Sequence, residues 1–142
     1  MKNVAHILAR KGNNVISVSP ECHVLDALKT MSDKNIGSMA VLEKGQYRGL
    51  MTERDYARKV ILKGKTSADT TVADIMSTDL PKISPEDTVD RCMRLMSEGN
   101  IRYLPVFEND MLCGIISIND VVKETILEQQ HTIEQLHNYI QS

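Results

Sequence analysis

The sequence lacks an excess of charge of either sign, and it lacks any long apolar run. It holds 17 Lys and Arg against 19 Asp and Glu, a formal net charge of −2 over 142 residues, of which 42% are hydrophobic. A near-neutral chain has no general electrostatic attraction for nucleic acid. Its apolar runs end after about four residues, whereas a membrane-spanning helix needs about 20. The composition predicts one ordinary soluble domain that binds neither nucleic acid nor membrane.

Cysteine is scarce, and the common enzyme motifs are missing. Cys22, Cys92 and Cys113 are odd in number and form no CxxC pair, which excludes a disulfide framework and a zinc site and predicts reduced thiols. There is no GxSxG, HExxH, P-loop or GxGxxG motif. Residues 1–10 form a short amphipathic stretch without a secretory signal's apolar core, so we expect a cytoplasmic protein. No catalytic set, catalytic cofactor or metal site is predicted.

An internal repeat is the most informative feature. When the sequence is shifted by 65 residues (84 − 19), identical residues meet without a gap. They include Ser19, Met31, Asn35, Gly49 and Asp55 in the first half, which meet Ser84, Met96, Asn100, Gly114 and Asp120 in the second. Such a tandem duplication predicts two halves that fold alike.

Within each half the hydrophobic period changes in the same order. A β-branched run is followed by Ser-Pro-Glu, a helix-start signal, and then by an apolar stripe at three- and four-residue spacing. Two strands joined by a turn and a second helix complete the unit. The predicted elements are 15–18, 24–31, 38–42, 47–51 and 54–62, and then 82–83, 89–96, 103–107, 112–117 and a helix from about 119. The fold class is therefore α+β, with two β-α-β-β-α repeats.

The remaining segments connect and extend these repeats. Residues 63–69 are polar and contain glycine, which is typical of a linker, and 72–76 predict a short helical lead-in. The predicted organisation is an N-terminal amphipathic segment (1–14), repeat 1 (15–63), a linker with the lead-in helix (64–79), repeat 2 (80–127) and a C-terminal helical extension (128–142).

Both halves end a strand with the pattern Gly-h-h-[Ser/Thr]-x-x-Asp at the start of a helix. The residues are Gly49, Thr52 and Asp55 in the first half and Gly114, Ser117 and Asp120 in the second. One interpretation is structural, because a hydroxyl followed three residues later by a carboxylate is a capping box. The other is functional: the helix N-terminus and the hydroxyl bind a phosphate, and the glycine leaves room for a ligand. The two are compatible.

The duplicated unit with this motif resembles a pair of CBS domains, a Bateman module. The helix-to-strand signatures that begin at Met31-Ser32 and Met96-Ser97 add to the resemblance, which spans about Val15 to Lys123. It implies two repeats packed as a pseudo-two-fold pair that bind adenine nucleotides or related ligands in clefts between them. Such modules sense or regulate rather than catalyse.

The resemblance also implies roles for single residues. Asp55 and Asp120 would bind ribose hydroxyls, with Thr52 and Ser117 near the phosphate. The candidate phosphate partners are Arg54, Arg58 and Arg102, the last with a surface salt bridge as the alternative. The candidate walls of an adenine slot, which are equally ordinary core residues, are Ile36, Met51, Ile83, Ile101, Pro105 and Ile116. At the position equivalent to Arg54, the second half has Asn119, where a glycine is commoner in the family. The second site is therefore expected to take a less charged ligand or none.

The expected function is that of a non-enzymatic sensor that binds AMP, ATP or NAD and acts on a partner protein. The alternative is a structural dimerisation module whose clefts have lapsed to capping boxes; an enzyme is a third class. A homodimer is also expected. Ile133, Leu136 and Ile140 follow the end of the repeat at helical spacing, without guaranteed cover in the monomer. We expect this helix to pack on the partner subunit or on the N-terminal segment of Val4, Ile7 and Leu8. For Val122 and Ile126, packing on the chain's own sheet is the alternative.

Overall fold

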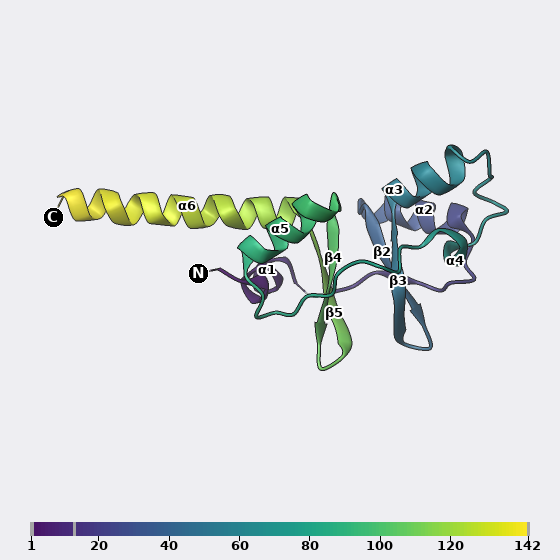
Figure 1. Ribbon diagram of the computed structural model, residues 1–142, viewed down its shortest axis with the longest axis horizontal. Coiled ribbons are helices and arrows are strands. Elements are labelled where there is room, and N and C mark those ends of the chain that lie inside the picture. The colour runs from purple at the N-terminus through teal and green to yellow at the C-terminus, as the bar shows by residue number, and fades with distance from the viewer. Residues whose placement is uncertain (1, 13, 142) are drawn as a thin grey trace. The chain divides into compact units, whose positions relative to one another are not determined.

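The computed structural model describes residues 2–12 and 14–141, so predictions for Met1, Asn13 and Ser142 lie outside the described residues. The chain divides into two compact units. The repeat-1 unit holds 14–80 and 109–112, and the repeat-2 unit holds 1–13, 81–108 and 113–142. Figure 1 labels helices α1–α6 and strands β2–β5 of the two units. In the part of the chain that is described, no helix is both long and apolar enough to cross a membrane.

The repeat-1 unit is built on a three-stranded sheet. Its elements are β1 (Ser17–Val18), α2 (Val24–Lys34), β2 (Ser38–Glu43), β3 (Gln46–Thr52), α3 (Glu53–Tyr56), the π-helical turn η1 (Ala57–Ile61) and α4 (Val72–Ile75). Strand β2 pairs in parallel with β1 and antiparallel with β3, with Ser38 opposite Thr52. Lys44 and Gly45, both at positive φ, form the tight turn between β2 and β3.

The repeat-2 unit has the same order with a smaller sheet. Its elements are α1 (Val4–Lys11), α5 (Val89–Gly99), β4 (Tyr103–Glu108), β5 (Met111–Ser117) and α6 (Ile118–Gln141). The strand predicted at 82–83 is reduced to one parallel bridge between Ile83 and Val106. The mixed α and β composition, the duplication and the long C-terminal helix agree with the prediction.

The shared Met-Ser…Asn-Ile signature is the end of a helix. Asn35 follows α2 and Asn100 follows α5, both in the left-handed conformation at φ 54° and 52°. The next amide, that of Ile36 or Ile101, donates to the carbonyl of Met31 or Met96, each at 3.0 Å. Asparagine tolerates this conformation better than most residues, which explains why it stands at both helix ends.

Each unit is completed by a helix that precedes the other repeat in the sequence. The amides of Val72 and Ala73 in α4 donate to the carbonyls of Cys22 and Pro20 at 2.8 and 2.9 Å. In the repeat-2 unit, Val4 and Ala5 in α1 donate to Asp87 and Pro85, both at 2.9 Å. The acceptors are 65 residues apart (87 − 22) and the donors 68 apart (72 − 4), so α1 and α4 hold equivalent places.

These two helices also fill equivalent positions in the two cores. Val72 and Ile75 lie among the buried residues of the repeat-1 unit, and Val4 and Ile7 among those of the repeat-2 unit, each at most 2% exposed. Burying a side chain of this size contributes about 1.5–3 kcal/mol, so a unit without its lead-in helix would lose a large part of its stability.

The Ser-Pro-Glu segment does not start a helix, contrary to the sequence prediction. Ser19, Pro20 and Glu21 form a turn, and α2 begins later, at Val24, with His23 as its N-cap. The Ser19 hydroxyl accepts a hydrogen bond from the Glu21 amide at 3.2 Å. The turn points the Pro20 carbonyl at the first turn of α4, which explains why a proline, having no amide donor of its own, fits there.

Helix α6 joins the repeat-2 unit through its first turns. Val121 and Glu124 are fully buried, whereas Val122 and Ile126 are 43% and 48% exposed. The alternative that Val122 and Ile126 pack on the chain's own sheet is therefore wrong. The buried face of α6 carries Val121 and Glu124 instead, and it packs on α1 and α5.

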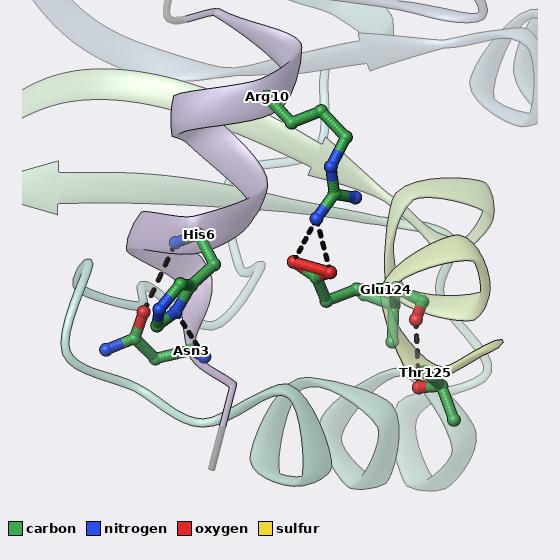
Figure 2. Close-up of polar contacts among 6 residues, drawn as sticks. Asn3, His6, Arg10, Glu124 and Thr125 are labelled. Carbon is green, nitrogen blue, oxygen red and sulfur yellow. Dashed lines mark hydrogen bonds and ion pairs between the residues drawn. The ribbon is translucent and has the colours of Figure 1, made fainter. Parts of the chain in front are cut away.

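A partly buried ion pair joins α1 to α6. The Arg10 guanidinium donates to both carboxylate oxygens of Glu124, with 2.8 Å to Oε1 (Figure 2). The Glu124 side chain is 0% exposed, and that of Arg10 is 42% exposed. A buried carboxylate is tolerated only when it is paired, so Arg10 is required for the packing of α6 on this unit. At the start of α1, Asn3 and His6 form a reciprocal N-terminal cap.

Removing Arg10 tests this requirement. Arg10→Ala leaves Glu124 buried without its partner, and we expect a loss of about 3 kcal/mol in the free energy of unfolding, measured by urea denaturation. The matched control is Arg48→Ala, because the Arg48–Glu43 pair has both side chains at least 40% exposed. An exposed pair of this kind contributes about 0–1 kcal/mol. Equal losses in the two variants would contradict the assigned role of Arg10.

Candidate functional site

In the repeat-1 unit the shared motif lies where β3 ends and α3 begins. The Thr52 Oγ1 accepts a hydrogen bond from the Asp55 amide at 3.1 Å. Asp55 Oδ2 in turn accepts from the amide and the hydroxyl of Thr52, both at 3.0 Å. The capping box predicted for this motif is therefore formed. It fixes the carboxylate at the strand end, where β3 holds Thr52 in register with Ser38.

The other oxygen of this carboxylate is also used within the chain. Asp55 Oδ1 accepts from the Ser77 hydroxyl at 2.8 Å and lies 3.0 Å from the Lys59 ammonium. Ser77 is positioned by a two-way backbone bridge to Leu50, at 2.8 and 3.0 Å. Asp55 is only 5% exposed. Four donors thus surround a buried carboxylate at this site.

The repeat-2 unit builds the same corner where β5 ends and α6 begins. Asp120 Oδ2 accepts from the Ser117 amide at 2.8 Å, and the Asp120 amide donates to Ser117 Oγ at 3.2 Å. The Asp120 side chain is 22% exposed, against 7% for Asp55. Among residues 2–12 and 14–141, no hydrogen bond to Asp120 Oδ1 is found. The second carboxylate is therefore the more open of the two.

Lys11 of α1 takes the place that Ser77 holds in the repeat-1 unit. Its ammonium donates to the Ile115 carbonyl and to Asp120 Oδ2, both at 2.7 Å. Ile115 is the equivalent of Leu50 (50 + 65), so one ammonium replaces both the Ser77 amide and the Ser77 hydroxyl. This exchange is possible because α1 stays helical through Lys11, whereas α4 ends at Ile75 and the chain becomes extended.

The fourth residue after the motif aspartate carries opposite charges in the two units, as Lys59 in the first and Glu124 in the second. Lys59 pairs with Asp55 and also donates to the Ile75 carbonyl at 2.9 Å. Its equivalent in the second unit is Glu124 (59 + 65), which is paired with Arg10. In the repeat-1 unit the cation, Lys59, thus comes from η1, which directly follows α3. In the repeat-2 unit two cations of α1 pair with the helix after the motif, Lys11 with Asp120 and Arg10 with Glu124.

The glycine of each motif makes room for the chain itself, not for a ligand. A Cβ on Gly49 would lie 2.5 Å from the Ser77 carbonyl oxygen, and one on Gly114 would lie 2.8 Å from the Leu8 side chain. The ligand space expected beside both glycines is therefore filled by the segment that follows α4 and by α1.

The three candidate arginines differ in exposure. Arg58 and Arg102 are exposed, and Arg54 is partly buried on the first turn of α3. Arg102 takes part in no ion pair within the described residues, so the surface salt bridge that was its alternative role is not formed there. Its backbone carbonyl accepts the Ile118 amide at 2.8 Å, at the start of α6.

Most of the candidate adenine walls are core residues. Met51 and Ile116 are 0% exposed, Ile83 is 3% exposed, and Pro105 is buried in β4. As the units stand, these side chains offer no surface to a ligand. Only Ile36 and Ile101, which follow the two left-handed asparagines at equivalent positions, are partly exposed.

The thiols are in surroundings that favour the neutral form. Burial raises the pKa of Cys92 to about 11, with the nearby Asp87 adding to the shift. Burial also raises the pKa of Cys22, with Asp26 contributing, and that of Cys113, with Glu108 contributing. A cysteine nucleophile requires a lowered pKa, so nucleophilic chemistry at these thiols is disfavoured. Within the described residues, no group of three or more His, Cys, Asp and Glu is placed to hold a metal ion.

Sequence reasoning missed Ser77, Lys59 and Lys11. A signal for Ser77 and Lys11 was present: Val4 and Ile7 repeat as Val72 and Ile75 at a spacing of 68 residues (72 − 4). That spacing differs from the 65 of the main repeat, and it marks α1 and α4 as equivalent.

Comparison with known proteins gives a family match on both halves. The model of the CBS-domain family matches residues 4–62 and 72–126. CBSX3, a mitochondrial CBS domain-containing protein of Arabidopsis thaliana, is 39% identical over 123 residues, 83% of this chain. The chain spans 60% of the length of that relative.

Solved structures give the same result. A protein with CBS domains from Burkholderia ambifaria is 40% identical, with a TM-score of 0.86, and the alignment covers 90% of this chain and 96% of that chain. A hexameric CBS-CP12 protein from bloom-forming cyanobacteria is 30% identical, with a TM-score of 0.75 and coverage of 86% and 70%.

Thiol reactivity tests the surroundings of Cys92. With Cys22 and Cys113 replaced by serine, the folded protein is expected to react with Ellman's reagent at pH 9 at least about 50 times more slowly than in denaturant, since a pKa of about 11 leaves about 1% thiolate. The rate in the folded state should rise between pH 9 and 11. Equal rates in the folded and unfolded protein at pH 9 would contradict the burial of Cys92.

Proposed function

The chain belongs to the CBS-domain family, and on that premise we propose that it is a sensor module that binds an adenine nucleotide, of the AMP, ATP or NAD class. Pairs of CBS domains are regulatory ligand-binding modules. The observation that carries the proposal is the recurrence of one hydroxyl–carboxylate pair, Thr52 with Asp55 and Ser117 with Asp120, at the same strand end in two units that differ at most other positions.

A ribose needs a carboxylate that accepts two hydroxyl hydrogen bonds. Asp120 is the better placed, because its side chain is 22% exposed. The bonds from Ser117 and Lys11 both end on its Oδ2, and within the described residues no hydrogen bond to its Oδ1 is found. Binding at Asp55 requires the ligand to take over the bonds from Ser77 and Lys59. We therefore propose that the repeat-2 site binds first, with Asp120 on the ribose and Ser117 toward the phosphate.

Lys11 adds a cation to the proposed repeat-2 site. Asn119 replaces Arg54 there, which led us to expect a ligand of lower charge. The ammonium of Lys11 lies 2.7 Å from Asp120 Oδ2 and 40% of its side chain is exposed, so it is near enough to reach an anionic ligand bound at Asp120. Arg54, Arg58 and Arg102 remain proposed phosphate partners, and Ile36 and Ile101 remain proposed contacts of the adenine ring.

A structural function is the second candidate, and one observation favours it. Every hydrogen bond found at Asp55 is made to the chain's own donors, Thr52, Ser77 and Lys59, and only 5% of the residue is exposed. A carboxylate of this kind holds α3, η1 and the segment after α4 together without any ligand. In that case the two units serve only to build and join a dimer.

The wider setting is also proposed. We infer that the chain is not an enzyme, that it acts in the cytoplasm on a partner protein, and that it forms a homodimer. The hexameric state of the cyanobacterial CBS-CP12 protein supports association between copies of such a chain. Closed two-fold pairs are the commonest arrangement of oligomers.

Calorimetry tests the ligand class. AMP, ATP, NAD and S-adenosylmethionine are titrated into the wild-type chain, and at least one adenine nucleotide is expected to bind. Asp120→Ala should weaken its own site by about 1–3 kcal/mol, roughly 5- to 150-fold, because ribose hydroxyls lose their acceptor. Asp55→Ala should do the same for the repeat-1 site.

The matched control is Asp33→Ala, an exposed carboxylate near the end of α2, which should leave binding unchanged. Since Asp55 also stabilises the fold, each variant's melting temperature is measured first. Equal nucleotide affinity in the wild type and in the Asp55→Ala/Asp120→Ala double variant would contradict the assigned roles. If none of the four compounds binds, the structural function is supported instead.

Thermal melting gives an independent check. A ligand that binds only the folded state raises its stability by about 2.7 kcal/mol at a concentration 100 times the Kd. We expect the melting temperature of the wild type to rise with nucleotide concentration and that of the double variant to stay flat. A flat melting temperature of the wild type in saturating AMP, ATP and NAD would contradict nucleotide sensing.

A further inference from the structure

Helix α6 carries an apolar stripe that its own unit leaves uncovered. Its inner face is buried at Val121 and Glu124. From Gln129 to Gln141 every residue is exposed. The stripe consists of Val122, Ile126, Ile133, Leu136 and Ile140, which are 43%, 48%, 64%, 58% and 80% exposed.

The spacing of this stripe is that of a coiled coil. Starting at Val122, the positions follow at alternating intervals of four and three residues, with Gln129 as the one polar member. In heptad notation Ile126, Ile133 and Ile140 are a positions, and Val122, Gln129 and Leu136 are d positions. A strict a/d seam is narrower than the stripe of a helix that packs in a globular core, and it fits a second helix of the same kind.

We propose that two copies of the chain pair along this seam, from Val122 to Ile140, as a parallel two-stranded coiled coil. The proposal extends the proposed homodimer by naming its surface and its orientation. The three β-branched a positions, all isoleucine, favour two strands when the d positions are not isoleucine as well. Here the d positions are valine, glutamine and leucine.

Gln129 decides the orientation. In a parallel pair, Gln129 of one copy faces Gln129 of the other, and each side-chain amide both donates and accepts a hydrogen bond. In an antiparallel pair that covers the same seam, Gln129 faces Ile133, and its buried amide loses its partners. An unsatisfied buried polar group is costly, so the parallel arrangement is preferred.

The residues beside the seam present no repulsion to this arrangement. The e positions are Lys123, Gln130 and His137, and the g positions are Thr125, Thr132 and Tyr139. Across a parallel pair, Thr125 faces Gln130 and Thr132 faces His137. No two like charges therefore meet along the interface.

The seam is short, but its helix is already formed. It covers fewer than three heptads, and an isolated helix of this length is marginal in water because nucleation is unfavourable. The 24-residue α6 starts on a folded unit, where Val121 and the Arg10–Glu124 pair hold its first turns. Pairing then adds burial without the nucleation cost, which gives a dimer that dissociates on dilution.

Sedimentation velocity over a range of concentrations tests the seam. The wild type is expected to be dimeric, and Ile133→Glu, which places a carboxylate at the central a position, should raise the dissociation constant more than tenfold. The matched control is His131→Glu, an exposed f position two residues away that gains the same charge and should remain dimeric. Far-UV circular dichroism verifies that both variants keep their helix.

Crosslinking tests the orientation. Leu136→Cys places two thiols side by side in a parallel pair, whereas in the antiparallel pair Leu136 lies opposite Ile126, ten residues or about 15 Å along the helix. Mild oxidation should give a covalent dimer with Leu136→Cys and none with the wild type, whose own cysteines serve as the control. If the wild type is dimeric but Leu136→Cys forms no covalent dimer on oxidation, the parallel orientation is contradicted.

The remaining outcomes separate this proposal from the broader one. If Ile133→Glu stays as dimeric as the wild type, the seam is wrong and the homodimer stands through another surface. If the wild type is monomeric at every concentration, both are wrong. Neither result changes the proposed nucleotide binding, which calorimetry tests on residues outside the seam.

Discussion

Each unit depends on burying a helix that comes from before the other repeat. Val4 and Ile7 close the core of the repeat-2 unit, and Val72 and Ile75 close that of the repeat-1 unit. Residues at the start of the chain therefore pack with residues after position 81, and the repeat-2 unit needs both segments to complete its core. It also brings Lys11, the last residue of α1, to Asp120 and Ser77, in the segment after α4, to Asp55, so the two sites are a consequence of the packing.

The two sites share one geometry and differ in their donors. Ser77 and Lys59 surround Asp55, whereas Lys11 alone replaces the contacts of Ser77 at Asp120. Where the repeat-1 unit has Lys59 the repeat-2 unit has Glu124, which pairs with Arg10. The positive charge therefore lies on the helix after the motif in the repeat-1 unit and on α1 in the repeat-2 unit. Duplication has therefore kept the corner while making one carboxylate closed and the other partly open.

Much of this was predictable from the sequence, because the repeat aligns without a gap. It located the two motifs and the strand pairs, and it placed Asn35 and Asn100 at equivalent positions, although their left-handed conformation was not predicted. The Ser-Pro-Glu turn was mistaken for a helix start, since a proline before an amphipathic stripe is typical of both. Lys11 and Ser77 were missed because their contacts join segments far apart in the sequence, and the 68-residue spacing that relates α1 to α4 differs from the 65 of the main repeat. The space beside Gly49 and Gly114 was assigned to a ligand, because a glycine shows that something approaches closely but not what it is.

The central claim is that the motif carboxylates exchange the chain's own donors for the hydroxyls of a ribose. A crystal structure of the chain grown with AMP tests it most directly. The account predicts a nucleotide whose two ribose hydroxyls lie about 2.7 Å from the Asp120 carboxylate oxygens, with the Ser117 side chain toward the phosphate. A nucleotide bound elsewhere, with the Lys11–Asp120 pair and the Asp55 hydrogen bonds unchanged, would contradict it.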